Sequence, residues 1–335
     1  MGKKLVKLTA AGVVYAGFAI YLYQPHFKSF DTIQYLLLVN VCLASVGCFV
    51  LSRRWIASFT GSFFAGAIYG FGPFMLGLAR YHPAGGLLAA AVPWLFCPAA
   101  FGPKGRQRWI SRLFLALPVL AILSFFQVSA YFRLFAIPIQ DRLHLADLAG
   151  LLAPLVMVNR GLSVVGFYHV PMAALVMGFC MLLVARRFGI MAIFVTAAVL
   201  GFCDSVLGAS PVIWFSIPAL CCSVLIGVGL QGLAGAGWTD RKWVLATTMV
   251  RVVLSLVTLL LAVKYFQVFA GFGAKHAKLL TEAAKMYLLG AVAVAVIFFM
   301  ARARLRLGWL RLALLCSAMA VDIFIGARFF VDKIF

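Results

Sequence analysis

Side chains that could do chemistry are scarce in this sequence, and one group of them is regularly spaced. Asp141, His144 and Asp147 recur at every third position, so in a helix they would share one face. Carboxylates around an imidazole could hold a metal ion or exchange protons with a substrate. Leucines at positions 145, 148, 152 and 155 fall on another face. This pattern predicts a short amphipathic helix at about 139–156 in the outer membrane interface, and we favour a solvated polar stripe over a site.

A second candidate is the tripeptide Arg80-Tyr81-His82, which follows an apolar segment interrupted by Gly72 and Pro73. Arginine binds phosphate through a planar fork of donors, and tyrosine and histidine can contact sugars or headgroups. These three residues are therefore candidates for binding a lipid phosphate. Arginine and tyrosine also anchor helices at the membrane interface without a specific ligand, and both interpretations stay open.

Two further charges fall inside apolar segments that are long enough to cross a bilayer. Arg251 and Asp322 would lie roughly 11 and 20 Å from the inner surface, at 1.5 Å per helical residue. An unpaired charge at such depth costs at least ~2.5–3.5 kcal/mol. We therefore predict that the two residues pair across packed helices, as a structural contact in preference to a proton or ion pathway. His169 is expected to be a hydrogen-bonded residue at a helix end.

Other catalytic or metal-binding patterns are not indicated. The eight cysteines lie in apolar runs without a CxxC pair, and HExxH and P-loop motifs are missing from the sequence. We therefore predict neither a metal site nor a cofactor. Asp31 is the sole acid of the first outer loop and is the candidate for a catalytic base, if the chain has one.

The elements that must position these residues are membrane helices. Hydrophobic residues make up 65% of the 335 positions and charged residues 11%, with a mean hydropathy of +1.08. Soluble proteins average roughly 45–50% apolar and about 25% charged residues. No polar stretch is long enough to fold separately. We therefore expect an all-α polytopic transmembrane helix bundle that forms a single integral-membrane domain over residues 1–335, with no soluble domain.

The apolar runs predict eleven spans, each near the ~20 residues that cross a bilayer. They cover residues 5–23, 32–51, 56–78, 84–101, 113–134, 162–184, 188–208, 211–235, 244–263, 286–301 and 309–331. A longer outer loop is expected at 264–285. Its second half has helix-forming composition, and we interpret it as a surface helix near headgroups.

The basic residues predict the orientation. The net charge of +21 is distributed in small groups between the apolar runs, which favours anionic headgroups over nucleic acid as the partner. Basic groups follow every second span, as cytoplasmic loops do in membrane proteins. The expected arrangement is a multi-pass protein of the bacterial inner membrane, with a cytoplasmic N-terminus and a periplasmic C-terminus.

Residues 35–101 resemble part of the GT-C superfamily of polytopic glycosyltransferases that use lipid-linked sugars. The resemblance lies in Leu51-Ser-Arg-Arg-Trp, in the segment from Gly66-Ala-Ile-Tyr-Gly-Phe-Gly-Pro through Arg80-Tyr-His, and in Val92-Pro-Trp. It implies an outward-facing loop at residues 80–86 and a polyprenyl phosphate as lipid ligand. GT-C enzymes carry their catalytic acid in a large first outer loop, whereas the first outer loop of this chain is short.

Three functions follow from these patterns. The leading hypothesis is a structural or accessory subunit of a larger inner-membrane complex, built on a reduced GT-C-like scaffold and bound to other membrane subunits. The second is a glycosyltransferase that uses a polyprenyl-phosphate sugar, with Asp31 as base and Arg80 and His82 at the phosphate. The third is a transporter.

Overall fold

The computed structural model describes residues 2–30, 32–56, 58–81, 83–100, 143–154, 166–203, 211–236, 240–268, 273–302 and 308–335. In these ranges the chain is helical, with short turns and loops and no strand. The predicted all-α class is therefore confirmed for the described part of the chain. The span predicted at 113–134 lies outside it.

In chain order the described helices are α1 (Gly2–Tyr23), η1 (Gln24–Ser29), η2 (Thr32–Tyr35), α2 (Leu36–Ser52), α3 (Phe59–Gly70), α4 (Pro73–Tyr81), α5 (Pro83–Ala100), η3 (Leu145–Leu151), α8 (Pro171–Val184), α9 (Phe188–Phe202), α10 (Pro211–Trp214), α11 (Ser216–Gly235), α12 (Arg241–Val268), α13 (Gly273–Arg302) and α14 (Gly308–Ile334).

Local sequence explains where several of these helices begin and end. The Ser58 side chain accepts a hydrogen bond from the Gly61 backbone N–H, which caps the start of α3. Phe71 and Gly72 separate α3 from α4, and Pro73 begins α4, because proline cannot donate a backbone hydrogen bond inside a helix but is tolerated at a helix start. Pro171 begins α8 in the same way.

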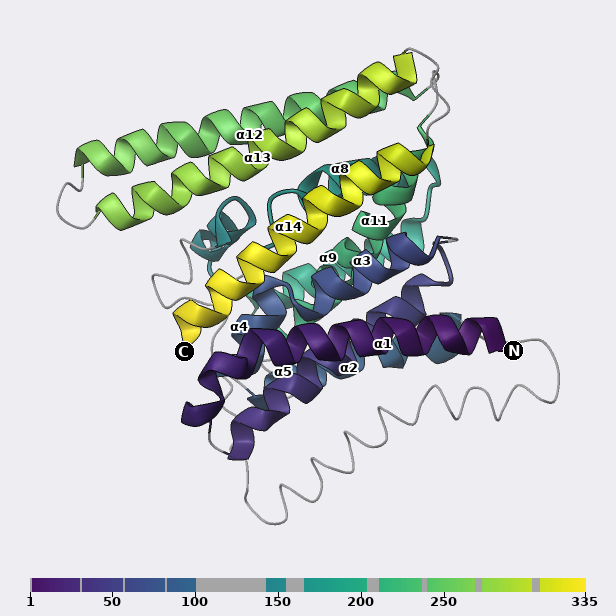
Figure 1. Cartoon of the computed structure of the whole chain (residues 1–335), viewed down its shortest axis with the longest axis vertical. Helices are drawn as coiled ribbons and strands as arrows, with labels where there is room; N and C mark the ends of the chain where they lie inside the picture. Colours follow the sequence, from purple (N-terminus) through teal and green to yellow (C-terminus); the bar gives the residue numbers. More distant parts are fainter. Residues whose placement is uncertain are drawn as a thin grey trace.

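The bundle has a central layer with helices on both sides of it (Figure 1). Helix α11 packs against α3 and α8, and α2 packs against α3 and α5. The long helices α12 and α13 form an antiparallel hairpin at one edge, and α14 crosses the bundle between this hairpin and the central layer (Figure 1). The buried core draws side chains from α1, α3, α8, α11 and α14.

Close approach of α8 and α11 depends on small residues. A methyl group at Gly229 would overlap the carbonyl oxygen of Ala174, and one at Gly178 would overlap that of Leu225. Because glycine has no side chain, the two helix backbones can touch at these positions. Small residues at the contact are the usual means by which helices associate in lipid. Each helix therefore supplies one glycine to this contact.

Six helices of the described ranges are long and apolar enough to cross a membrane. They are Leu5–Lys28, Phe59–Arg80, Pro211–Gly235, Arg241–Lys264, Ala277–Met300 and Gly308–Ile334. Four shorter apolar helices, Leu36–Ser52, Gly85–Pro98, Ala174–Val184 and Phe188–Phe202, correspond to other predicted spans. The chain is thus a membrane-embedded helical protein, and the count of eleven spans stays a prediction.

The predicted outer connection at 264–285 is more helical than expected, and the helix predicted in its second half belongs to a longer one. Helix α12 continues through Val268, and α13 already begins at Gly273. Alanine, lysine, leucine and glutamate dominate residues 274–285 and are good helix formers, so the helix starts well before the apolar run. The two helices have 28 and 30 residues, or roughly 42 and 45 Å, which exceeds the ~30 Å of a bilayer core.

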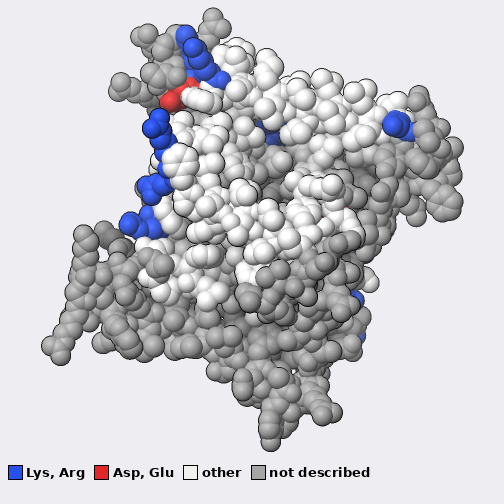
Figure 2. All heavy atoms as spheres, turned by 180° about the vertical axis from the view of Figure 1, so that it is seen from behind, with Lys and Arg blue, Asp and Glu red and all other residues white. Residues whose placement is uncertain are grey.

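One end of the bundle carries a row of basic side chains (Figure 2). The start of α1, the start of α12 and the start of α14 lie at one end, and the C-terminus lies at the other (Figure 1). Lysine and arginine side chains gather along the edge of the molecule at that first end (Figure 2). Exposed Arg54, Arg186 and Arg187 lie in the connections after α2 and α8, and we refer to this end as the basic end.

Candidate functional site

A short non-helical segment lies inside the bundle, just before α8. Residues 166–168 are irregular, and His169 and Val170 form a turn before Pro171. Phe167, Tyr168, His169 and Val170 are each at most 5% exposed. Backbone groups in such a segment have no helical partners, and in a membrane protein they must be satisfied by other protein groups.

Asp322 of α14 satisfies the backbone N–H at the end of this segment. Its Oδ2 accepts a hydrogen bond from the Val170 N–H, and its Oδ1 lies 3.5 Å from His169 Nδ1. Asp322 is 1% exposed. Val170 immediately precedes α8, so the carboxylate also sits at the positive end of that helix.

Arg251 of α12 satisfies the carbonyl of the same residue. Its Nη1 donates to the Val170 oxygen at 2.8 Å, and its Nε donates to the Tyr287 carbonyl at 3.3 Å. Its Nη2 donates to the carbonyl of Met286 at 3.4 Å. The guanidinium is completely buried, and a methyl group at Gly290 would overlap it. Arg251 therefore joins the α12–α13 hairpin to the segment that precedes α8.

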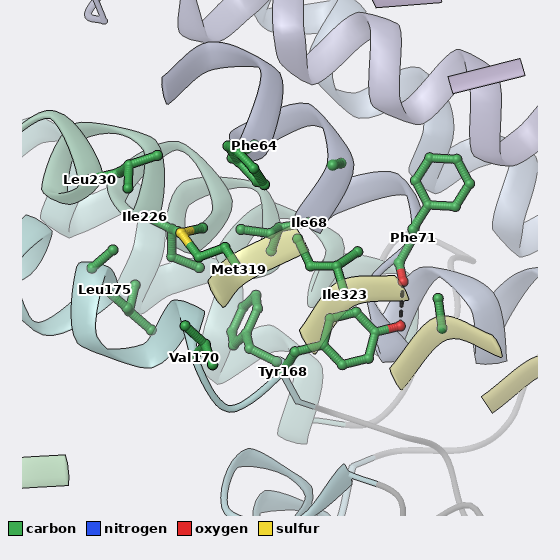
Figure 3. Close-up of a cluster of buried hydrophobic side chains, with 14 of the residues drawn as sticks. Phe64, Ile68, Phe71, Tyr168, Val170, Leu175, Ile226, Leu230, Met319 and Ile323 are labelled. Carbon is green, nitrogen blue, oxygen red and sulfur yellow. Dashed lines mark hydrogen bonds between the residues drawn. The ribbon is translucent and has the colours of Figure 1, made fainter. Parts of the chain in front are cut away.

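Two tyrosines complete this buried cluster. The hydroxyl of Tyr287 donates to the carbonyl of Leu152 at 2.8 Å, and its ring meets His169 edge-to-face at 5.0 Å. The hydroxyl of Tyr168 donates to the Phe71 carbonyl at 2.6 Å, as the dashed line in Figure 3 marks. That carbonyl precedes the Gly-Pro break between α3 and α4, so Tyr168 provides the partner that an uninterrupted helix would have provided.

The predicted pairing of Arg251 with Asp322 takes an indirect form. No direct ion pair joins them among the contacts of the described residues; both bind Val170, one at its carbonyl and the other at its N–H. The prediction missed the polypeptide segment between the two side chains. Nothing in the local sequence marks Val170 as the shared partner of Arg251 and Asp322. Valine has an apolar side chain, and only its backbone N–H and carbonyl form these hydrogen bonds.

His169 also differs from its prediction. It lies beside the start of α8 and is 3% exposed, but neither of its ring nitrogens has a hydrogen-bond partner among the described residues. The Asp322 carboxylate lies 3.5 Å from its Nδ1. A buried imidazole without hydrogen bonds is uncommon, because each unpaired polar atom carries a desolvation penalty.

The predicted polar stripe around residue 144 does not form one exposed face. The structure has a seven-residue 3-10 helix at Leu145–Leu151 in place of a helix over 139–156. His144 is exposed, whereas Asp147 is buried and accepts a hydrogen bond from the His144 backbone N–H at 2.8 Å. Asp147 thus has a local capping role. Asp141, the third member, lies outside the described residues.

Arg80 contacts the C-terminal end of the chain. Its Nε donates to the Ile334 carbonyl at 3.3 Å, and its guanidinium lies 4.4 Å from the centre of the Phe335 ring. This contact competes with the predicted phosphate site. The side chains of Tyr81 and His82, and Asp31, lie outside the described residues, so the phosphate-binding group stays a prediction. In the described ranges no cluster of three or more His, Cys, Asp or Glu residues could hold a metal ion.

The comparisons with known proteins give no relatives. No family model matches the chain, and no match is found among curated proteins or solved structures.

Proposed function

We propose that this protein is a structural subunit of a bacterial inner-membrane complex, built on a reduced GT-C-like scaffold, and that the α12–α13 hairpin contacts a neighbouring membrane subunit. The observation that carries the proposal is the form of this hairpin. Its two helices pack mainly against each other at one edge of the bundle (Figure 1). Arg251 fixes the hairpin to the interior through Val170.

The outer surface of the hairpin supports this role. Val253 and Leu260 of α12 and Val292 and Phe299 of α13 are each more than half exposed. These side chains extend over several turns of both helices, so a helix of another subunit could pack along them. Lipid chains would cover the same surface if the protein acted alone. An experiment must therefore distinguish contact with another subunit from contact with lipid.

Site-specific photo-crosslinking in intact membranes distinguishes a neighbouring protein from lipid at this surface. A photoreactive residue at Val253 or Val292 should form a discrete adduct with a second membrane protein. The matched control is Val195 of α9, which is as exposed as these positions at 55% and lies outside the hairpin. Adducts with lipid alone at Val253 and Val292, as at the control, would contradict the subunit role.

A transporter is the second candidate, because buried His169 and Asp322 lie 3.5 Å apart beside an irregular segment. Ionisable residues and broken helices at membrane depth commonly mark ion or substrate pathways. Substrate-dependent uptake into liposomes that is lost in Asp322→Asn would favour this function.

The glycosyltransferase hypothesis rests on the sequence resemblance. It assigns Asp31 as base and a polyprenyl-phosphate sugar as donor. Sugar transfer by the purified protein that disappears in Asp31→Asn would favour it over the structural role.

A further inference from the structure

A largely apolar hollow opens near the basic end of the bundle. It has a volume of about 490 Å³ and lies between α2, α5, α8, α9 and α11. Phe96, Ile193, Val224 and Val228 line its walls, and Trp55 and Arg187 belong to its lining in the connections after α2 and α8. We call this hollow the α8–α11 groove. Its volume falls in the range of ordinary ligand pockets, roughly 300–1,000 Å³.

Exposed tryptophans place the mouth of the groove at the level of lipid headgroups. Trp55, Trp243 and Trp309 are 43%, 46% and 71% exposed. Trp55 follows α2, and the other two lie in the first turns of α12 and α14, at the basic end. Tryptophan concentrates at membrane–water interfaces, because its ring is apolar and its N–H is polar. From Arg187 to Ile193 the lining runs roughly 9 Å along α9, which takes it from the interface toward the hydrocarbon core.

The basic side chains around the mouth of the groove favour binding of an anionic group there. Arg54, Arg186 and Arg187 are exposed there, and the basic edge in Figure 2 contains many more lysine and arginine side chains than acidic ones. A second hollow of about 540 Å³ shares Trp55 and Met181 with the groove and adds the polar residues Gln231 and Asp240. The mouth therefore combines several cationic groups with one amide and one carboxylate, whereas the interior is apolar.

We propose that the α8–α11 groove is a binding site for an anionic phospholipid from the leaflet at the basic end. One acyl chain occupies the apolar interior between α8, α9 and α11. The phosphate lies at the mouth, where Arg187 binds it through charge-assisted hydrogen bonds. Trp55 covers the glycerol region beside it. This site is distinct from the outward group Arg80-Tyr81-His82 and does not depend on the subunit role.

Native mass spectrometry of the full-length protein tests the site. The protein is delipidated and offered equal amounts of phosphatidylglycerol and phosphatidylethanolamine with identical acyl chains. We expect the wild type to retain phosphatidylglycerol in about tenfold excess: Arg187 can bind the phosphate of either lipid, but the arginines at the mouth repel the ammonium group of phosphatidylethanolamine. Equal retention of the two lipids by the wild type would overturn the proposal without any variant.

Two pairs of variants locate the site. Arg187→Gln should abolish the preference for phosphatidylglycerol, whereas Arg54→Gln, in the same basic surface but outside the groove lining, should keep it. Val228→Trp should displace the retained lipid, whereas Val14→Trp on the exposed face of α1 should not. Val224→Trp, one turn earlier on the same wall, serves as a second groove-filling variant. Equal effects within either pair would place the bound lipid elsewhere and overturn the assignment.

Discussion

Val170 is held at both of its backbone polar groups by side chains of opposite charge. Asp322 binds its N–H and Arg251 binds its carbonyl, so the peptide groups flanking Val170 lie between a negative and a positive charge. Each charge thereby gains a hydrogen-bond partner without contacting the other directly. Buried charges are tolerated when they are paired and hydrogen-bonded, and this arrangement meets both conditions through the backbone.

The first prediction concerns the two charges together. Asp322→Asn should lower the unfolding temperature in detergent, because Arg251 loses its nearby counter-charge while the Val170 N–H keeps an acceptor. Removing one partner of a buried pair costs about 3–5 kcal/mol. Adding Arg251→Gln in the same chain should restore part of that loss. Destabilisations that simply add in the double variant would show that the two charges act independently.

The second prediction concerns the space around the guanidinium. Gly290→Ala should destabilise the protein by about 1–3 kcal/mol, because the added methyl group would overlap the Arg251 side chain. Gly17→Ala in α1 is the matched control, since a methyl group there meets nothing within 4 Å. Thermal unfolding of both variants measures the difference. Equal stability of the two would contradict the tight fit at Gly290.

At the scale of elements, the break between α3 and α4 leaves the Phe71 carbonyl to be satisfied by Tyr168, which is distant in the sequence. Tyr168→Phe should destabilise the protein by about 1–3 kcal/mol, because the buried Phe71 carbonyl would lose its donor. Tyr21→Phe is the control, since Tyr21 is 45% exposed. Chemical denaturation in detergent checks the prediction, and an unchanged stability in Tyr168→Phe would show that another donor reaches Phe71.

The helices themselves could be predicted from the sequence, whereas the contacts between them could not. Apolar runs predicted the helices well, because lipid leaves the backbone few alternatives to a helix. Helices α12 and α13 exceed their apolar runs, because helix propensity continues beyond the hydrocarbon core. The contacts of Val170 were not predictable, since its partner Asp322 lies 152 positions away.

At the scale of the whole molecule, the row of basic side chains at one end predicts its orientation. Single cysteines at Arg54 and Lys278, in a background without the native cysteines, lie at the basic end and at the opposite end. The first should be shielded from an impermeant thiol reagent in intact cells and react after permeabilisation. The second should react in intact cells. The reverse pattern would invert the predicted topology.

The account as a whole depends on whether this chain works within a larger membrane assembly. Native mass spectrometry of gently solubilised membranes measures this most directly, because it weighs the 36.4 kDa chain together with whatever remains bound. The predicted result is the chain in a fixed ratio with a second membrane protein, which dissociates when Val253 and Val292 on the α12–α13 hairpin are replaced by arginine. If the chain is found only as a monomer, with bound lipids or as a homo-oligomer, the proposed subunit role is contradicted.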